Sequence, residues 1–336
     1  MHTATRPPPR AEAELKIENL RIGFKKNGRE FHAVRGIDFE LKRCETLALV
    51  GESGCGKTVT ALSILRLLAE PPAKVLSGSI RLGGVDLLGL SEEGIRKVRG
   101  REIAMIFQDP MTSLNPVLSI GEQIMETLRR HTSLGRKNLE QRAVDLLRRV
   151  EIPSPVEKLR QYPHQLSGGM RQRVMIAIAL SCEPRILIAD EPTTALDVLV
   201  QAQIMDLLKQ LKADTGLSIL LITHDLGIVS EIADRALVMY AGEIVESGPV
   251  AQLFQSPLHP YTRGLLTSVP QIGRRPAAGR LQEITGQVPR PEERPAGCAF
   301  HPRCPSAMDR CLTDAPVLEE KRPGRRASCW LEQDAP

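Results

Sequence analysis

A glycine-rich stretch that ends in a lysine and a threonine, residues 51–58, has the residue types and spacing to bind phosphate. Its sequence, GESGCGKT, fits the pattern G-x-x-x-x-G-K-[ST] of loops that hold nucleoside triphosphates. Lys57 would reach the outer phosphates, and the Thr58 hydroxyl would ligate Mg²⁺. Three glycines would let the backbone approach phosphate oxygens without a Cβ clash: Gly51, Gly54 and Gly56. We predict that the whole loop surrounds the nucleotide, including the residues between the glycines: Glu52, Ser53 and Cys55.

Two neighbouring carboxylates end an apolar run later in the chain. Residues 185–191, RILIADE, read as a buried strand that finishes in Asp190 and Glu191. An aspartate at the end of a strand beside a phosphate loop can hold Mg²⁺ through water. The adjacent glutamate can orient the attacking water or take its proton. The pair therefore predicts hydrolysis of the bound nucleotide.

Gln108 and His224 also follow apolar strands. Gln108 comes after residues 103–107 and precedes the turn-rich stretch DPMTSLNP. Its amide could reach a metal or the attacking water. His224 comes after residues 218–223, at the sheet edge where α/β proteins bind ligands. That position favours a phosphate contact over the structural role that a lone histidine usually has.

A second stretch suited to an anion is LSGG at residues 166–169. Ser167, Gly168 and Gly169 precede the helical sequence MRQRVMIAIALS, so they lie at a helix N-terminus, which presents N–H groups to anions. Taken alone, the stretch would be explained as an ordinary helix cap. Together with the loop at residues 51–58, it gives one chain two phosphate-type sites.

The elements predicted around these residues define an α/β fold. Leu47–Val50 reads as a buried parallel strand, and residues 59–68 after the loop have helical spacing. Phe24 ends the first of two antiparallel strands, where it could stack on an adenine ring, although an isolated phenylalanine is more often a core residue. The other predicted elements are strands at 15–24, 31–41, 78–86, 103–108 and 218–223, helices at 120–130, 139–150 and 198–213, and a hairpin at 236–248 that would close the domain.

Composition narrows the classes of protein. The chain has 336 residues, enough for about two domains, and a net charge of +5. Aromatic residues make up only 3% of the chain, which argues against a base-stacking nucleic-acid platform. No apolar run approaches the ~18 residues of a transmembrane helix, and MHTATRPPPR is not a secretory signal. We therefore expect a cytosolic protein with reduced cysteines.

By its order of motifs the chain resembles an ATP-binding cassette ATPase. The motifs are GESGCGKT, Gln108, LSGGMRQR, LIADE, ALD at residues 195–197, and the histidine of ITHD. The resemblance implies a P-loop (RecA-like) nucleotide-binding domain at residues 14–250, with an antiparallel β subdomain and a helical subdomain at about 109–178. Residues 251–336 would form a C-terminal extension. ATP and Mg²⁺ are the implied cofactors.

The resemblance also implies a role for each matching residue. Residues 51–58 are similar to Walker A, and Phe24 to the adenine-stacking aromatic. Gln108 matches the Q-loop glutamine, and Ser167, Gly168 and Gly169 belong to the signature. Asp190 matches the Walker B aspartate and Glu191 the catalytic glutamate. Asp197 matches the D-loop aspartate and His224 the switch histidine. Two positions depart from the family pattern. Cys44 replaces a turn glycine, and Cys55 replaces a common serine, where a reactive thiol would be conceivable.

Partners follow from the same resemblance. In such families two nucleotide-binding subunits pair head to tail, and each ATP lies between one Walker A and the partner's signature. The expected assembly therefore contains two transmembrane permease subunits, a second ATPase subunit (identical or homologous) and an extracytoplasmic solute-binding protein. The chain would lie peripherally on the cytoplasmic face of the inner membrane.

The finer resemblance is to oligopeptide and dipeptide importers. It rests on FQDPMTSLNPVLSIGEQI, ALDVLVQAQI, SPLHPYTRGLL and the long C-terminal extension. Peptide is the implied cargo, with nickel, glutathione or another small solute as alternatives, because the ATPase subunit does not touch the cargo. A soluble cassette ATPase acting on nucleic acid or ribosomes is a further alternative. It is disfavoured by the single Walker A sequence and the low aromatic content.

Four cysteines in the extension suggest a metal site. They lie in GCAFHPRCPSAMDRC…SCW, with the spacing C-x5-C-x6-C-x17-C, in a segment with too few apolar residues for its own core. Zinc usually prefers C-x2–4-C pairs, whereas wider gaps suit an iron–sulfur cluster. Spacing alone leaves both open. The resemblance to the importers implies a 4Fe–4S cluster, with these ligands: Cys298, Cys304, Cys311 and Cys329.

Overall fold

The computed structural model describes residues 13–26, 28–194, 196–268 and 284–331, and it divides into two compact units. Unit 1 contains the described residues up to Lys16, residues 40–46 and residues 81–220. Unit 2 contains residues 17–39, 47–80 and the described residues from Leu221 onward. No helix of the described part is long and apolar enough to cross a membrane. The expected leader, residues 1–13, lies almost wholly outside the described residues.

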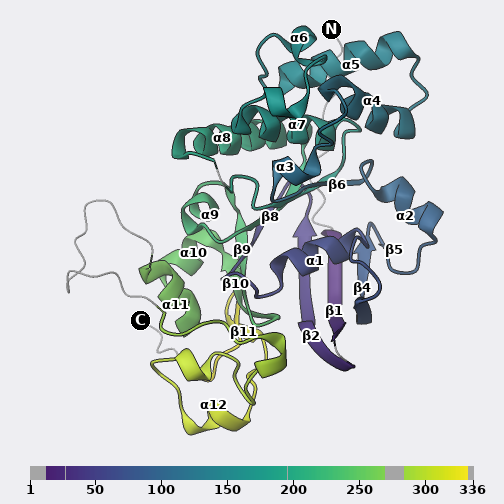
Figure 1. Cartoon of the computed structure of the whole chain (residues 1–336). Coiled ribbons are helices and arrows are strands. Elements are labelled where there is room, and N and C mark those ends of the chain that lie inside the picture. Colours follow the sequence, from purple (N-terminus) through teal and green to yellow (C-terminus); the bar gives the residue numbers. More distant parts are fainter. Residues whose placement is uncertain (1–12, 27, 195, 269–283, 332–336) are drawn as a thin grey trace. The chain divides into compact units, whose positions relative to one another are not determined.

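Unit 1 carries most of the helices (Figure 1). Strands β6 and β7 pair in parallel, from Ile103 with Ile186 to Ile106 with Ala189. Between residues 110 and 180 the described part of the chain contains helices but no strand, and α4, α5 and α7 pack on one another. The elements are β5 (Val85–Asp86), α2 (Glu92–Val98), β6 (Ile103–Ile106), α3 (Pro110–Ser113), α4 (Ile120–His131), α5 (Arg136–Arg149), α6 (Pro155–Lys158), a 3-10 turn (Pro163–Gln165), α7 (Gly168–Leu180), β7 (Ile186–Asp190) and α8 (Val198–Thr215).

Unit 2 contains five neighbouring strands of one sheet, in the order β11-β12-β10-β9-β3. In this sheet β3 and β9 are parallel, from Leu47 with Arg235 to Val50 with Val238, and the other pairs are antiparallel. Its elements are β3 (Thr46–Val50), α1 (Lys57–Ile64), α9 (Leu226–Ile232), β9 (Arg235–Tyr240), β10 (Glu243–Pro249), α10 (Val250–Gln255), α11 (Pro260–Thr267), 3-10 turns (Pro291–Glu293 and His301–Arg303), α12 (Asp309–Thr313), β11 (Glu319–Arg322) and β12 (Arg325–Ala327).

Five strands have residues in both units: β3, whose Thr46 belongs to unit 1, and four others, β1 (Ala13–Lys26), β2 (Arg29–Lys42), β4 (Ala73–Leu82) and β8 (Ser218–Thr223). The predicted strand at residues 78–86 is wrong, because the chain turns at Gly83 and Gly84. Both glycines have positive φ (53° and 89°), so β4 ends at Leu82 and pairs back with β5, Arg81 opposite Asp86. The strands predicted at 15–24 and 31–41 are confirmed as β1 and β2, which are neighbours in one sheet.

The predicted hairpin of β9 and β10 exists, but it does not close the sheet. Strand β12 pairs with β10, Glu246 opposite Ala327, and β11 pairs with β12. The Glu246 carboxylate is fully buried and accepts hydrogen bonds from the N–H groups of Leu258 and His259. It also accepts a hydrogen bond from the buried Arg325 guanidinium at 3.2 Å. Strands β12 and β11 thus extend the sheet beyond β10, beside a buried ion pair that sequence motifs do not indicate.

Described residues of the extension belong to the core of unit 2, among them Leu253, Tyr261 and Phe300. Phe300 is 2% exposed and packs against Tyr240 and Tyr261, with ring centroids 5.2 and 5.4 Å away. Tyr240 and Tyr261 are themselves 4.7 Å apart and fully buried. Aromatic contacts of this kind add to the free energy gained by burial.

Candidate functional site

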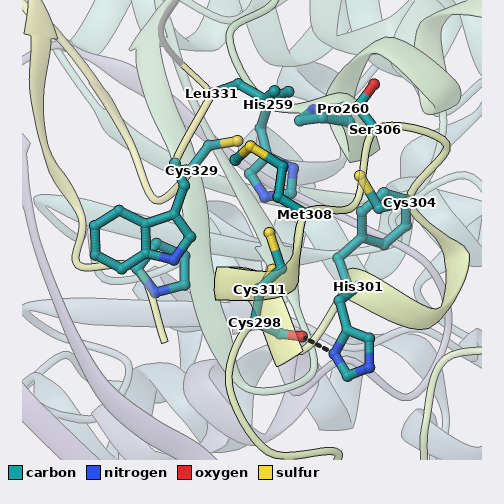
Figure 2. Close-up of a pocket in the computed structure, with 13 residues that line it drawn as sticks. His259, Pro260, Cys298, His301, Cys304, Ser306, Met308, Cys311, Cys329 and Leu331 are labelled. Carbon is teal, nitrogen blue, oxygen red and sulfur yellow. Dashed lines mark hydrogen bonds between the residues drawn. The ribbon is translucent and has the colours of Figure 1, made fainter. Parts of the chain in front are cut away.

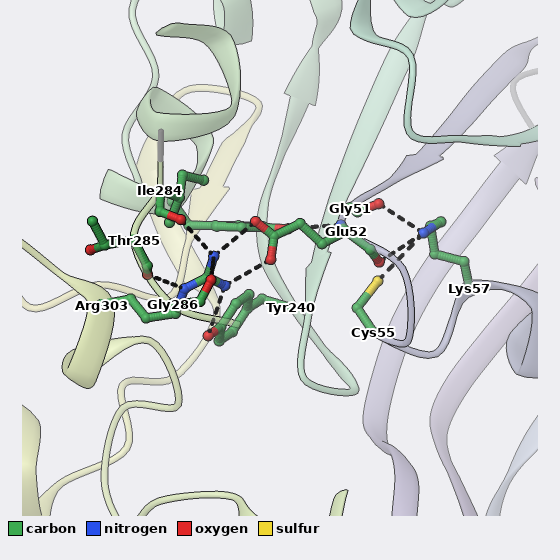
Figure 3. A network of polar contacts seen from close by, with 10 residues as sticks. Gly51, Glu52, Cys55, Lys57, Tyr240, Ile284, Thr285, Gly286 and Arg303 are labelled. Carbon is green, nitrogen blue, oxygen red and sulfur yellow. Dashed lines mark hydrogen bonds and ion pairs between the residues drawn. The ribbon is translucent and has the colours of Figure 1, made fainter. Parts of the chain in front are cut away.

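The glycine-rich loop at residues 51–56 joins β3 to α1, so the strand-to-helix context predicted for it is confirmed. Lys57 is the first residue of α1 and is 5% exposed. Its ammonium donates hydrogen bonds to the carbonyl oxygens of Gly51 (2.7 Å) and Glu52 (2.9 Å), as Figure 3 shows. The Thr58 side chain next to it is exposed. The Lys57 ammonium is therefore bonded to the backbone of the same loop.

Two of the loop glycines are required by close approach. A Cβ on Gly51 would lie 2.2 Å from the carbonyl oxygen of Met239, and one on Gly56 would lie 2.8 Å from that of Ala33. Gly56 also has a φ of 109°, which L side chains rarely adopt. Cys55 is 1% exposed, and burial raises the pKa of its thiol. The reactive thiol considered for this position does not fit such an environment.

In unit 1 the structure brings Gln108 and Glu191 together. The Gln108 amide donates a hydrogen bond of 2.9 Å to the Glu191 carboxylate, and the Thr194 hydroxyl donates to the same oxygen at 2.9 Å. Glu191 has a φ of 46°, unusual for a residue other than glycine and typical of strained functional positions. Asp190 is the last residue of β7 and is 2% exposed.

The LSGG stretch lies at the start of α7, as predicted. The Ser167 hydroxyl accepts a hydrogen bond from the Met170 N–H at 3.3 Å, so it does cap the helix. Ser167 and Gly168 are exposed. A Cβ on Gly169 would lie 2.7 Å from the Val200 side chain, which explains a glycine there. Asp197 caps α8, accepting from the Val200 N–H at 2.9 Å.

Phe24 and His224 belong to unit 2, the first near the end of β1 and the second directly after β8. Phe24 on β1 is half-buried and stacks on Phe31 of β2, with ring centroids 5.9 Å apart and planes at 11°. It is therefore neither a fully buried core residue nor a lone aromatic. His224 follows β8 and is exposed, and the next residue, Asp225, caps α9.

The four cysteines of the extension line one pocket, together with His259, Phe300, Met308 and Trp330 among others (Figure 2). None of the seven cysteines forms a disulfide. Burial raises the pKa of Cys298 to about 11 and also raises the pKa values of Cys304 and Cys329. Among the described residues, no group of three or more His, Cys, Asp or Glu side chains is arranged to hold a metal ion.

Two side chains that bind the loop were missed from the sequence. The Tyr261 hydroxyl accepts a hydrogen bond from the Glu52 N–H at 2.9 Å, and Arg303 forms an ion pair with the Glu52 carboxylate. They lie in PYTR and HPRC, neither of which marks a nucleotide site. Nothing in the local sequence indicates that these segments reach a loop more than 200 residues earlier.

Comparison with known proteins gives the family. Residues 34–194 match the model of the ABC transporter family, and residues 245–311 match that of the oligopeptide/dipeptide transporter C-terminal region. The chain is 52% identical to the oligopeptide transport ATP-binding protein AppD of Bacillus subtilis, over 95% of this chain and 97% of that protein. It is 51% identical to a putative peptide import ATP-binding protein of Brucella abortus, over 94% of each.

Solved structures agree with this relationship. The chain resembles the ATP-binding cassette MJ0796, solved as a dimer in a post-hydrolysis state with ADP and Pi, with a TM-score of 0.63 and 27% identity over 70% of this chain and 98% of that one. It also resembles cbiO1 of Clostridium perfringens, with a TM-score of 0.63 and 30% identity over 73% and 92% of the two chains. The chain therefore belongs to the ATP-hydrolysing subunits of ABC transporters, in the oligopeptide/dipeptide transporter family.

Proposed function

We propose that this chain hydrolyses ATP to power the import of peptides through partner permease subunits. The observation that carries the proposal is the presence of both family regions in one chain, the ABC ATPase and the oligopeptide/dipeptide C-terminal region. The relatives named for peptide import cover nearly the whole chain, which supports a peptide cargo over nickel or glutathione. We further propose residues 14–250 as the ATPase domain and residues 251–336 as the importer extension.

The roles of the site residues are part of the same proposal. The loop at residues 51–58 would hold the phosphates, with Thr58 and Asp190 on Mg²⁺. Glu191 would orient the attacking water or take its proton. The hydrogen bond from Gln108 to Glu191 supports this, because it fixes the carboxylate from a second loop. His224, exposed at the end of β8, would contact the outer phosphate.

A second ATPase subunit, identical or homologous, is proposed as the partner of the signature. Ser167 and Gly168 are exposed at the start of α7, which leaves this helix end accessible to an anion held by another chain. At the start of α8, beside Asp197, Val198 and Leu199 are 80% and 78% exposed. Neighbouring exposed apolar side chains of this kind are a common feature of protein interfaces.

Peptide uptake tests the proposal in cells. Deleting the gene for this chain is expected to abolish uptake of labelled di- and oligopeptides, with restoration by the wild-type chain and none by Glu191→Gln. The same cells are assayed for nickel and glutathione uptake. Purification of the wild-type chain from detergent-extracted membranes should also recover two hydrophobic permeases and a second ATPase. In intact cells the complex is expected at the cytoplasmic face of the inner membrane. Peptide uptake that survives the deletion, or recovery of RNA in place of permeases, would refute the proposal.

The four cysteines are proposed to hold a 4Fe–4S cluster with a structural role. Four thiols line one pocket, in a segment that contributes only a few side chains to the core, and this set of ligands fits a cluster bound by Cys298, Cys304, Cys311 and Cys329. The proposal rests on the kind and number of side chains at this pocket, since no group of described residues is arranged to hold a metal ion. When bound, the cluster would cross-link the segments that carry the cysteines.

Cysteine substitution distinguishes a cluster from zinc. Anaerobically purified chain is expected to be brown, with about four iron and four acid-labile sulfide per chain. Cys304→Ser or Cys329→Ser should lose the iron, because one of four ligands is gone. Cys182→Ser, half-buried in unit 1, should keep it. Stoichiometric zinc without sulfide in the wild-type preparation would contradict the cluster.

A further inference from the structure

The side chain of Glu52, in the phosphate-binding loop, is held by the C-terminal extension. Arg303 donates two parallel hydrogen bonds to its carboxylate, Nη1 to Oε2 at 2.7 Å and Nη2 to Oε1 at 3.0 Å (Figure 3). The Arg303 side chain is 7% exposed and that of Glu52 is 27% exposed. A two-pronged guanidinium–carboxylate pair shielded from water is much stronger and more directional than an exposed ion pair.

Arg303 is itself fixed on every side by other groups of unit 2. Its Nε donates to the carbonyl of Thr285 at 2.9 Å, and its Nη2 approaches the carbonyls of Ile284 and Gly286 at 3.3 Å each. Its Nη1 also lies 3.4 Å from the Tyr240 hydroxyl. Because these contacts occupy its donors, the guanidinium has one orientation. Glu52 is therefore bound to a rigid group.

The backbone of Glu52 is held as well. Its N–H donates to the hydroxyl of Tyr261, a residue that is fully buried against Tyr240 and Phe300. The carbonyl of Glu52 in turn accepts a hydrogen bond from the Lys57 ammonium at 2.9 Å. The backbone of Glu52 is thus bonded directly to the lysine that is proposed to bind the outer phosphates.

We propose that the C-terminal extension positions the phosphate-binding loop for ATP through Glu52, with Arg303 as the positioning residue. The Walker A pattern leaves the residue after its first glycine open, so phosphate binding alone does not require an acid there. The contact with Arg303 explains why residue 52 is a glutamate, since Arg303 would otherwise be a buried charge without a counter-ion. The extension thereby takes part in nucleotide binding without touching the nucleotide.

A double-mutant cycle on the full-length chain tests this. Arg303→Gln and Glu52→Gln are each expected to raise the Kd of a fluorescent ATP analogue, and the KM for ATP, by about fivefold, with kcat within about twofold of wild type. The double variant should bind ATP no more weakly than either single variant, because the two substitutions remove the same contact. Arg303→Lys should be intermediate, since an ammonium cannot donate in two parallel directions.

Arg294→Gln is the matched control. Arg294 belongs to the same extension and pairs with Glu243 at 2.9 and 3.0 Å, with a similarly shielded side chain. It is expected to leave ATP affinity unchanged. Unaltered affinity in Arg303→Gln, additive losses in the double variant, or an equal loss in Arg294→Gln would each overturn the proposal. If Arg303→Gln does not fold, as judged by its melting curve, Arg303→Lys and Glu52→Gln carry the same comparison.

Discussion

Glu191→Gln is expected to lower steady-state ATP hydrolysis by about a hundredfold to ten-thousandfold while ATP affinity stays within about threefold of wild type. Glutamine keeps the size of the side chain, and its carbonyl oxygen can still accept from Gln108 and Thr194, so the local structure should persist. What it loses is the carboxylate that handles the attacking water. The phosphate-binding loop is untouched by the substitution.

Phosphate release and binding of a fluorescent ATP analogue, measured on the same preparations, check this result. Glu140→Gln serves as the control, because Glu140 is an exposed carboxylate of unit 1 in an ion pair on α5. Its turnover and affinity should equal those of the wild type. Turnover of Glu191→Gln within about threefold of wild type would show that another group handles the water.

Lys57→Ala is expected to weaken ATP binding by about a hundredfold or more, because charge-assisted hydrogen bonds to phosphate are lost. The substitution also removes the ammonium that bonds the carbonyls of Gly51 and Glu52, so the loop loses its internal support. Both effects act on affinity, in contrast to Glu191→Gln, which acts on the chemical step.

Lys57→Met separates the loss of the ammonium from the loss of side-chain volume. Methionine fills the buried space of the lysine stem without its charge, so a similar loss of affinity in both variants would assign the effect to the ammonium. Lys97→Ala is the control, since Lys97 is an exposed lysine paired with Glu93 on α2. Calorimetric titration with ATP measures all four proteins. Unchanged affinity in Lys57→Ala would remove Lys57 from the site.

The parts of the structure that were predicted correctly depend on short-range patterns. The loop between β3 and α1 has a fixed spacing of glycines, and β8 is an apolar run bounded by polar residues, so each can be recognised within about ten residues. Cys44 belongs here too. Its place at a turn position of glycine agrees with its φ of 56°. Its N–H and thiol bond to Ser218 and Gly216.

The parts that were missed depend on contacts between distant residues. The pairing of β12 with β10 joins residues about 80 positions apart, and a strand of three residues carries no periodicity of its own. The contact of Arg303 with Glu52 spans 251 positions. The register of such pairs is set by tertiary packing, here by the buried Arg325–Glu246 pair and the ring of Phe300, which no motif encodes.

The order of β10 and β12 along the chain has a consequence for biosynthesis. Until the ribosome has made residues 325–327, β10 has no β12 beside it and remains an unprotected edge, open to pairing with another nascent chain. Glu246, buried in the finished protein, has no Arg325 to neutralise it until that codon is read. The sheet of unit 2 therefore cannot be completed before residue 327 is made, and a message truncated before codon 325 would yield a subunit prone to aggregate.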